Sequence, residues 1–119
     1  MKILLDHCMP RRFRRLLPGC DVKTSFEMHW SDLDNGLLLA TAAPHFDAFI
    51  TVDQNIRYQQ NLATLPLPVI ILVARNNELA TLTPYAPVVL ATLQRMSNIC
   101  LVRIFRDDSV QITPKSDKP

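Results

Sequence analysis

The chain has 119 residues, of which 48% are hydrophobic, so it is long and apolar enough to fold as one domain around a core. Its formal net charge of +2 is too small to predict nucleic-acid binding by itself. No apolar run approaches the length of a membrane span, and the charge of Asp6 comes too early for a signal peptide, so we expect no membrane association. The three cysteines form no CxxC pair, which is typical of reduced thiols. The sequence therefore predicts a cytoplasmic protein with one domain over residues 1–113 and a disordered polar tail over residues 114–119.

Predicted strands and helices alternate along most of the chain. Residues 2–5 form a short apolar run, typical of a buried strand, and residues 10–17 carry apolar side chains at helical spacing. The further predicted elements, in chain order, are a strand over residues 21–25, a helix over 37–43, a strand over 46–53, a short helix or turn over 54–62, a strand over 69–74, a helix over 83–96, and strands over 99–105 and 110–113. This alternation predicts a three-layer α/β fold with a central, mostly parallel sheet flanked by helices.

Two aspartates, Asp6 and Asp53, each end a hydrophobic strand. The carboxyl ends of parallel strands meet at one edge of a sheet, where ligands bind, so we expect the two side chains to face each other there. Carboxylate oxygens suit Mg²⁺ or Mn²⁺, which can generate a nucleophilic water and hold phosphate oxygens. The pattern therefore favours a metal-dependent catalytic site. The alternative is that each aspartate only caps a following helix.

The stretches around both aspartates resemble a family of small bacterial PIN-like proteins. Residues 4–12, LLDHCMPRR, are similar to the opening of that family, and residues 46–62, FDAFITVDQNIRYQQNL, are similar to its longer middle motif. Weaker similarity extends the resemblance over residues 1–105. It implies a PIN-like fold and a ribonuclease-type acidic site with Asp6 and Asp53 as catalytic residues and ligands of Mg²⁺ or Mn²⁺. It also implies RNA as the substrate, a role as the toxin of a toxin–antitoxin pair with a small antitoxin protein as partner, and a homodimer.

This chain departs from the family pattern at three positions. The family commonly has glutamate, asparagine and glutamate where this chain has His7, Cys8 and Leu37. A PIN-type site normally collects three or four carboxylates, and only two matching ones remain, with Asp34 or Asp32 as a candidate replacement ligand. Two hypotheses therefore stay open: a ribonuclease with a depleted acidic site, or a catalytically inactive PIN-like module that binds RNA or protein. A receiver-type or phosphoryl-transfer α/β domain ranks third, because the further acid and the lysine that it needs are missing.

Arginine residues follow several of the predicted strands. Four of them occupy the first predicted helix: Arg11, Arg12, Arg14 and Arg15. Arg57 follows Asp53, and Arg75 follows the next strand. In a parallel sheet these residues lie on or near the edge that carries the aspartates, so we expect Arg11, Arg12, Arg57 and Arg75 to contact RNA phosphates. The alternative for the first helix is an ordinary solvated face.

Overall fold

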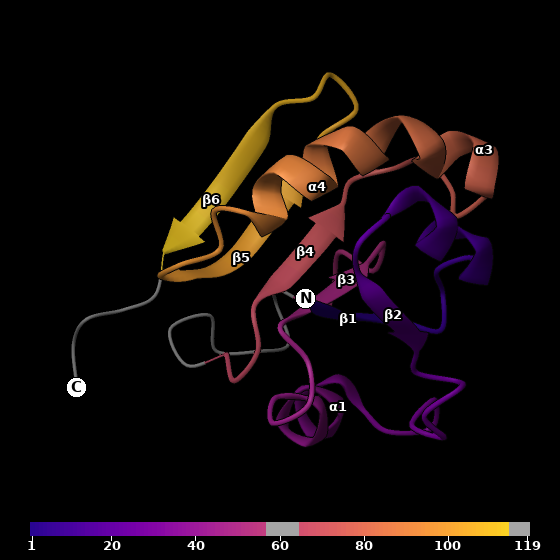
Figure 1. The fold of residues 1–119 in the computed structure, drawn as a ribbon, viewed down its shortest axis with the longest axis vertical. Helices are drawn as coiled ribbons and strands as arrows, with labels where there is room; N and C mark the ends of the chain where they lie inside the picture. Colours follow the sequence, from indigo (N-terminus) through magenta and orange to yellow (C-terminus); the bar gives the residue numbers. More distant parts are fainter. Residues whose placement is uncertain (57–64, 115–119) are drawn as a thin grey trace.

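A computed structural model describes residues 1–56 and 65–114. Its centre is a six-stranded sheet with the strand order β2-β1-β3-β4-β5-β6 (Figure 1). The strands are β1 (Lys2–Leu5), β2 (Asp21–Thr24), β3 (Ala48–Thr51), β4 (Val69–Leu72), β5 (Ile99–Ile104) and β6 (Val110–Pro114). The first five run parallel, and β6 returns antiparallel to β5. The predicted α/β fold with a mostly parallel sheet is therefore confirmed.

Helices cover both faces of the sheet. The 3₁₀ helix η1 (Arg11–Leu16) lies on one face with α3 (Leu79–Leu82), the 3₁₀ turn η3 (Thr83–Tyr85) and α4 (Ala86–Leu93). The helix α1 (Asn35–Ala42) lies on the other face, so the molecule has three layers (Figure 1).

The central strands are apolar on both sides because both of their faces are buried. In β4, Ile70 and Leu72 pack into the layer of α3 and α4, whereas Val69 and Ile71 pack into the layer of α1. A strand with one solvent-facing side would alternate apolar and polar residues instead. This pattern explains why unbroken apolar runs predicted the strands correctly.

Two helices differ from the prediction, and proline accounts for one difference. The last helix begins at Leu79 rather than at residue 83, and its α-helical pattern is interrupted at Thr83–Tyr85. Pro84 has no N–H group and its ring crowds the carbonyl of the preceding turn, so the chain tightens into 3₁₀ geometry there before α4 continues. The segment predicted as a helix over residues 10–17 is a 3₁₀ helix over Arg11–Leu16, closed by i→i+3 bonds such as Phe13 N to Pro10 O at 3.0 Å. It ends before Gly19, whose φ of +83° suits glycine.

The boundaries of other predicted segments also change, and the helix predicted over residues 37–43 is α1 at Asn35–Ala42. Strand β3 is limited to Ala48–Thr51, so Asp53 lies two residues beyond it. Pro114, expected to begin the tail, is the last residue of β6. Most of the predicted helix or turn over residues 54–62, and residues 115–119 of the predicted tail, lie outside the described residues. Within residues 1–56 and 65–114, no helix combines the length and apolar content needed to cross a bilayer.

Candidate functional site

The two aspartates lie at the point where the sheet changes direction. From β1 the chain passes to β2 on one side, and β3 takes the place on the other side of β1. Such a switch point leaves a crevice outside the carboxyl ends of the two strands, where α/β proteins bind their ligands. Asp6 follows β1 directly, and its N–H donates to Ile50 O of β3 at 3.0 Å. Asp6 is therefore at a strand end as predicted, whereas Asp53 lies in the turn two residues after the end of β3.

Asp6 is a buried carboxylate with contacts to both oxygens. Its exposed fraction is 3%. Oδ2 accepts a hydrogen bond from Thr51 Oγ1 at 2.7 Å, and Oδ1 accepts one from His7 N at 2.8 Å. His7 Nδ1 lies 3.0 Å from Oδ1, and Cys8 Sγ lies 3.5 Å from Oδ2. Because a buried charge is costly unless it is hydrogen-bonded, these contacts are what allow a carboxylate to remain at this position.

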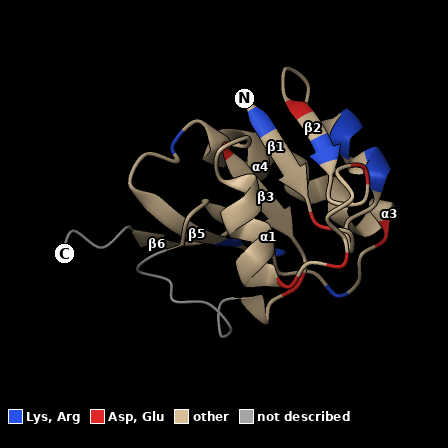
Figure 2. Ribbon diagram, turned by 90° about the horizontal axis from the view of Figure 1, so that it is seen from below, with Lys and Arg blue, Asp and Glu red and all other residues tan. Residues whose placement is uncertain are grey.

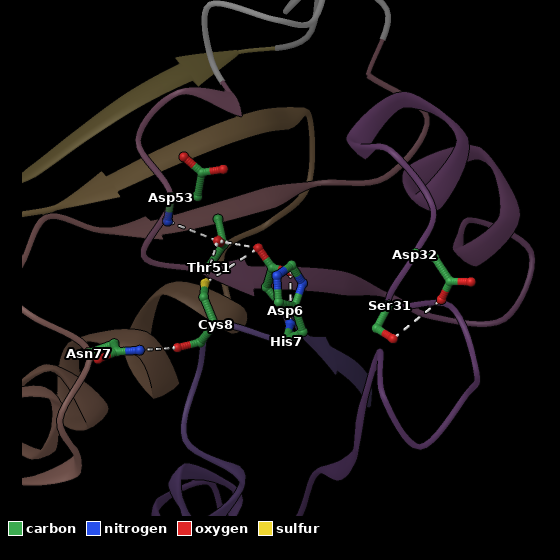
Figure 3. Close-up of polar contacts among 8 residues, drawn as sticks. All are labelled: Asp6, His7, Cys8, Ser31, Asp32, Thr51, Asp53 and Asn77. Carbon is green, nitrogen blue, oxygen red and sulfur yellow. Dashed lines mark hydrogen bonds and ion pairs between the residues drawn. The ribbon is translucent and has the colours of Figure 1, made fainter.

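Thr51 connects the two aspartates, and the sequence analysis missed it. In the register of β1 and β3, Leu5 lies opposite Ile50, so Thr51 is the neighbour of Asp6. Its hydroxyl is buried, donates to Asp6 and accepts from Asp53 N at 2.9 Å (Figure 3). The available signal was a hydroxyl residue at the end of an otherwise apolar strand, two positions before an aspartate.

The Asp53 carboxylate does not face Asp6. Figure 3 shows it turned away from Asp6, on the far side of the Thr51 hydroxyl. Its Oδ1 accepts from Asn55 N at 2.9 Å, which is the local turn contact expected of a strand-end aspartate. The Thr51 hydroxyl therefore joins the Asp6 carboxylate to the backbone N–H of Asp53, and not to its carboxylate. The expectation that the two carboxylates face each other is not met by this side-chain conformation.

Asp34 has a structural role in this conformation. It is the N-cap of α1, and its Oδ1 accepts from Leu37 N at 2.9 Å. Asp32, on the same loop, accepts from Ser31 Oγ at 3.5 Å. Among the described residues, no group of three or more histidine, cysteine, aspartate or glutamate side chains is arranged to hold a metal ion. The predicted metal ligands Asp6, Asp53 and Asp34 thus remain a prediction.

Cys8 is a half-buried free thiol at the rim of this network. Burial raises its pKa above the usual value, and the negative charge of Asp6 adds to this rise, while the hydrogen bond with Thr51 opposes it. A raised pKa disfavours the thiolate that both covalent catalysis and soft-metal binding require. The peptide oxygen of Cys8 accepts from Asn77 Nδ2 at 2.8 Å, which ties this turn to the loop after β4.

Ser25 extends the polar row to a third strand. It follows β2, its N–H donates to Leu5 O at 2.9 Å, and the register of β1 and β2 makes it the neighbour of Asp6. Its hydroxyl is fully buried and has no hydrogen-bond partner among the residues described. Ser25, Asp6 and Thr51 therefore form a polar row across β2, β1 and β3, at the edge where the apolar strands end.

Basic residues line two hollows of the surface. One, of about 290 Å³, is lined by Arg11, Arg12, Arg14 and Arg15, whose blue cluster lies beside β2 in Figure 2. Arg14 is held there by Glu27 and by Val22 O. The other, of about 200 Å³, is lined by Arg75, Tyr85 and Arg106 among others. Arg106, which follows β5, was not predicted, and Arg57 lies outside the described residues.

Comparison of the chain with protein-family models, with curated proteins and with solved structures found no match.

Proposed function

We propose that this protein is a metal-dependent ribonuclease of the PIN-like type with a depleted acidic site, acting in the cytoplasm. The observation that carries the proposal is the network of Asp6, Thr51 and Asp53 at the switch point of the sheet. Burying a carboxyl group costs folding free energy, and buried carboxyl groups of this kind are concentrated at functional sites. The resemblance of residues 4–12 and 46–62 to PIN-like proteins supports the same reading.

The donor set fits a hydrated Mg²⁺ or Mn²⁺. These ions prefer oxygen ligands, and Mg²⁺ usually keeps several waters while it binds one or two carboxylates and the substrate phosphates. Two of the Asp6 contacts come from side chains that can move: the exposed imidazole of His7 and the thiol of Cys8 at 3.5 Å. Their displacement would free lone pairs of Asp6, and a rotation of the Asp53 side chain would add a second ligand. A bound ion would supply an activated water and stabilise charge on the phosphate.

The arginines that line the two hollows would hold the RNA backbone. Arg11 and Arg12 belong to η1, which follows the turn after Asp6, and Arg75 and Arg106 follow β4 and β5. Guanidinium groups pair with phosphate oxygens in a bidentate manner, and they would offset the repulsion between the acidic site and a polyanion. The proposal that the protein is a toxin, held in check by a small antitoxin protein, rests on the resemblance.

A second candidate is a catalytically inactive PIN-like module that binds RNA or protein. The observation that favours it is the engagement of both Asp6 oxygens by His7, Cys8 and Thr51, together with the rotation of Asp53 away from Asp6. In this reading the network is a structural remnant and the arginines are the functional surface. The two candidates differ in one measurable property, since only the first requires a divalent cation.

The test is cleavage of a panel of single-stranded RNAs in the presence of Mg²⁺ or Mn²⁺. Wild-type protein should cleave, and Asp53→Asn should lose about a hundredfold or more of the rate, the scale of removing one charge-stabilising group. Asp47→Asn is the matched control, because this exposed aspartate accepts a hydrogen bond from Lys2 N at the amino end of β1 and belongs to no part of the network. Cleavage that Asp53→Asn leaves unchanged would remove the mechanism, and metal-independent RNA binding without cleavage would favour the second candidate.

A further inference from the structure

The outer edge of the sheet at β6 carries exposed apolar side chains. β6 pairs with β5 on one side only and is the last strand of the sheet, beside α4 in Figure 1. Val110 is 38% exposed and Ile112 is 53% exposed. Proteins usually protect an edge strand with charges, proline or a covering segment, because its free backbone groups can pair with another chain. An edge strand with apolar residues at alternate positions is therefore a candidate interface.

The hairpin register shows which backbone groups of β6 face outward. Phe105 N donates to Ser109 O at 2.9 Å, so this pair is hydrogen-bonded. Hydrogen-bonded and non-hydrogen-bonded pairs alternate in an antiparallel ladder, which makes Arg103 and Gln111 the next hydrogen-bonded pair. The N–H and C=O groups of Val110 and Ile112 consequently point away from β5, toward the free edge.

A groove runs along the same strand on the α4 side. It has a volume of about 210 Å³ and is lined by Val110, Ile112, Ile99, Val88, Ala91, Thr92 and Arg95. Most of this lining is apolar, and one end is marked by the exposed Arg95, after the last turn of α4. Ile99 is the register partner of Pro114, so the Arg95 end of the groove is the Pro114 end of β6.

We propose that this edge binds the same edge of a second copy of the chain, so that two β6 strands pair antiparallel across a twofold axis at Gln111. In this register Val110 lies opposite Ile112 of the second copy, and the outward groups of both residues complete two hydrogen-bonded pairs. A register centred on Ile112 would place Val110 opposite Pro114, which has no N–H to donate. The pairing around Gln111 therefore satisfies the outward groups of both Val110 and Ile112.

Charge complementarity favours a second copy over an unrelated strand. In the antiparallel arrangement, the β5–β6 turn of the second copy lies beside the Pro114 end of β6. That turn carries Asp107 and Asp108, and the end it meets carries Arg95. Hydrogen bonds from Ser109 lower the pKa of Asp107, so this carboxylate is charged at neutral pH. The twofold axis repeats this contact, so the acidic turn of each copy lies beside Arg95 of the other copy.

The test is a charge-swap experiment with the full chain, read by sedimentation equilibrium. Wild-type protein should form a dimer, and Arg95→Asp or Asp108→Arg should each weaken the dimer by about tenfold or more through repulsion at both ends. The double variant should restore the dimer. An equimolar mixture of the two single variants should form a heterodimer, because both of its contacts then join opposite charges.

Two further variants make the test specific. Ile112→Lys should abolish the dimer, because it places a charge in the apolar pairing. Arg12→Asp, in the 3₁₀ helix η1 that precedes the opposite edge strand β2, should leave the dimer unchanged. Circular dichroism of each variant separates dissociation from misfolding. A wild-type monomer, a dimer that survives Ile112→Lys, or a double variant that stays dissociated would each overturn the proposal. None of these readouts depends on RNA cleavage, so the interface and the proposed function fail independently.

Discussion

Replacing Thr51 with valine removes one hydroxyl and keeps the shape of the side chain. The hydroxyl is buried, donates to Asp6 Oδ2 at 2.7 Å and accepts from Asp53 N at 2.9 Å. A hydrogen bond to a charged group contributes about 1.5–3 kcal/mol to stability. Leaving the half-buried N–H of Asp53 without its acceptor costs about 1 kcal/mol more. We expect Thr51→Val to lower the free energy of unfolding by about 3 kcal/mol.

Thr51→Ser is the matched control, because it keeps the hydroxyl and removes a methyl group. Its expected cost is about 1 kcal/mol, the scale of deleting one buried methyl group. Urea denaturation followed by the fluorescence of the single tryptophan, Trp30, measures both variants. All proteins must be compared at one concentration, because a dimer that dissociates on unfolding makes stability concentration-dependent.

A double-mutant cycle that combines Thr51→Val with Asp6→Asn separates the energy of the Thr51–Asp6 contact from the other effects of each substitution. If the Thr51 hydroxyl acts mainly on the Asp6 charge, Thr51→Val should cost about 1–2 kcal/mol less in the Asp6→Asn background. The reasoning would be refuted if Thr51→Val were no more destabilising than Thr51→Ser, or if the two substitutions were additive. Either result would mean that the network is not a coupled unit.

Three further predictions concern protonation and charge. Contacts with the Thr24 backbone N–H and with Arg14 lower the pKa of Glu27, so the stability that Glu27 contributes is present above its usual pKa and is lost as pH falls through the lowered value. The melting temperature of Glu27→Gln should therefore fall less steeply with acid than that of wild type, and parallel curves would contradict this. Because the pKa of Cys8 is raised, iodoacetamide should alkylate Cys8 more slowly than a free thiol at neutral pH, and the rate should rise at a higher pH. Mass spectrometry measures the rate, which Asp6→Asn should increase; equal rates in wild type and Asp6→Asn would exclude the contribution of Asp6. Arg12→Ala and Arg75→Ala should each reduce the salt dependence of RNA affinity by about one phosphate contact. Arg103→Ala should not, because Arg103 pairs with Gln111 and stacks on Phe105. Fluorescence anisotropy across a salt series measures these slopes, and unchanged slopes would place the RNA elsewhere.

The strands of the sheet could be predicted from sequence because burial on both faces leaves a local pattern of apolar residues. Strands buried on both faces need unbroken apolar runs, and the chain contains such runs at residues 3–5 and at Val69–Leu72. Asp6 comes directly after the first of these runs, which is why the sequence indicated it. The 3₁₀ geometry of Arg11–Leu16 was missed, since helical spacing over so few residues does not distinguish i→i+3 from i→i+4 bonding.

The candidate site could be predicted only in part, because its organisation depends on strand order and side-chain direction. That β1 and β3 are neighbours comes from the sheet topology, and this neighbourhood is what brings Thr51 to Asp6. A single threonine in a strand carries no pattern of its own. The orientation of Asp53 is likewise set by its turn contact with Asn55, which residue spacing does not reveal. The sequence identified the edge, and the structure identified the network that organises it.

The most direct test of the proposed site is calorimetric titration of the protein with Mn²⁺. The account predicts one bound ion per chain, with affinity reduced by about tenfold or more in Asp6→Asn and in Asp53→Asn, and unchanged in Asp47→Asn, at the amino end of β1. Absence of Mn²⁺ binding by the wild-type protein, or binding that survives both Asp6→Asn and Asp53→Asn, would contradict it.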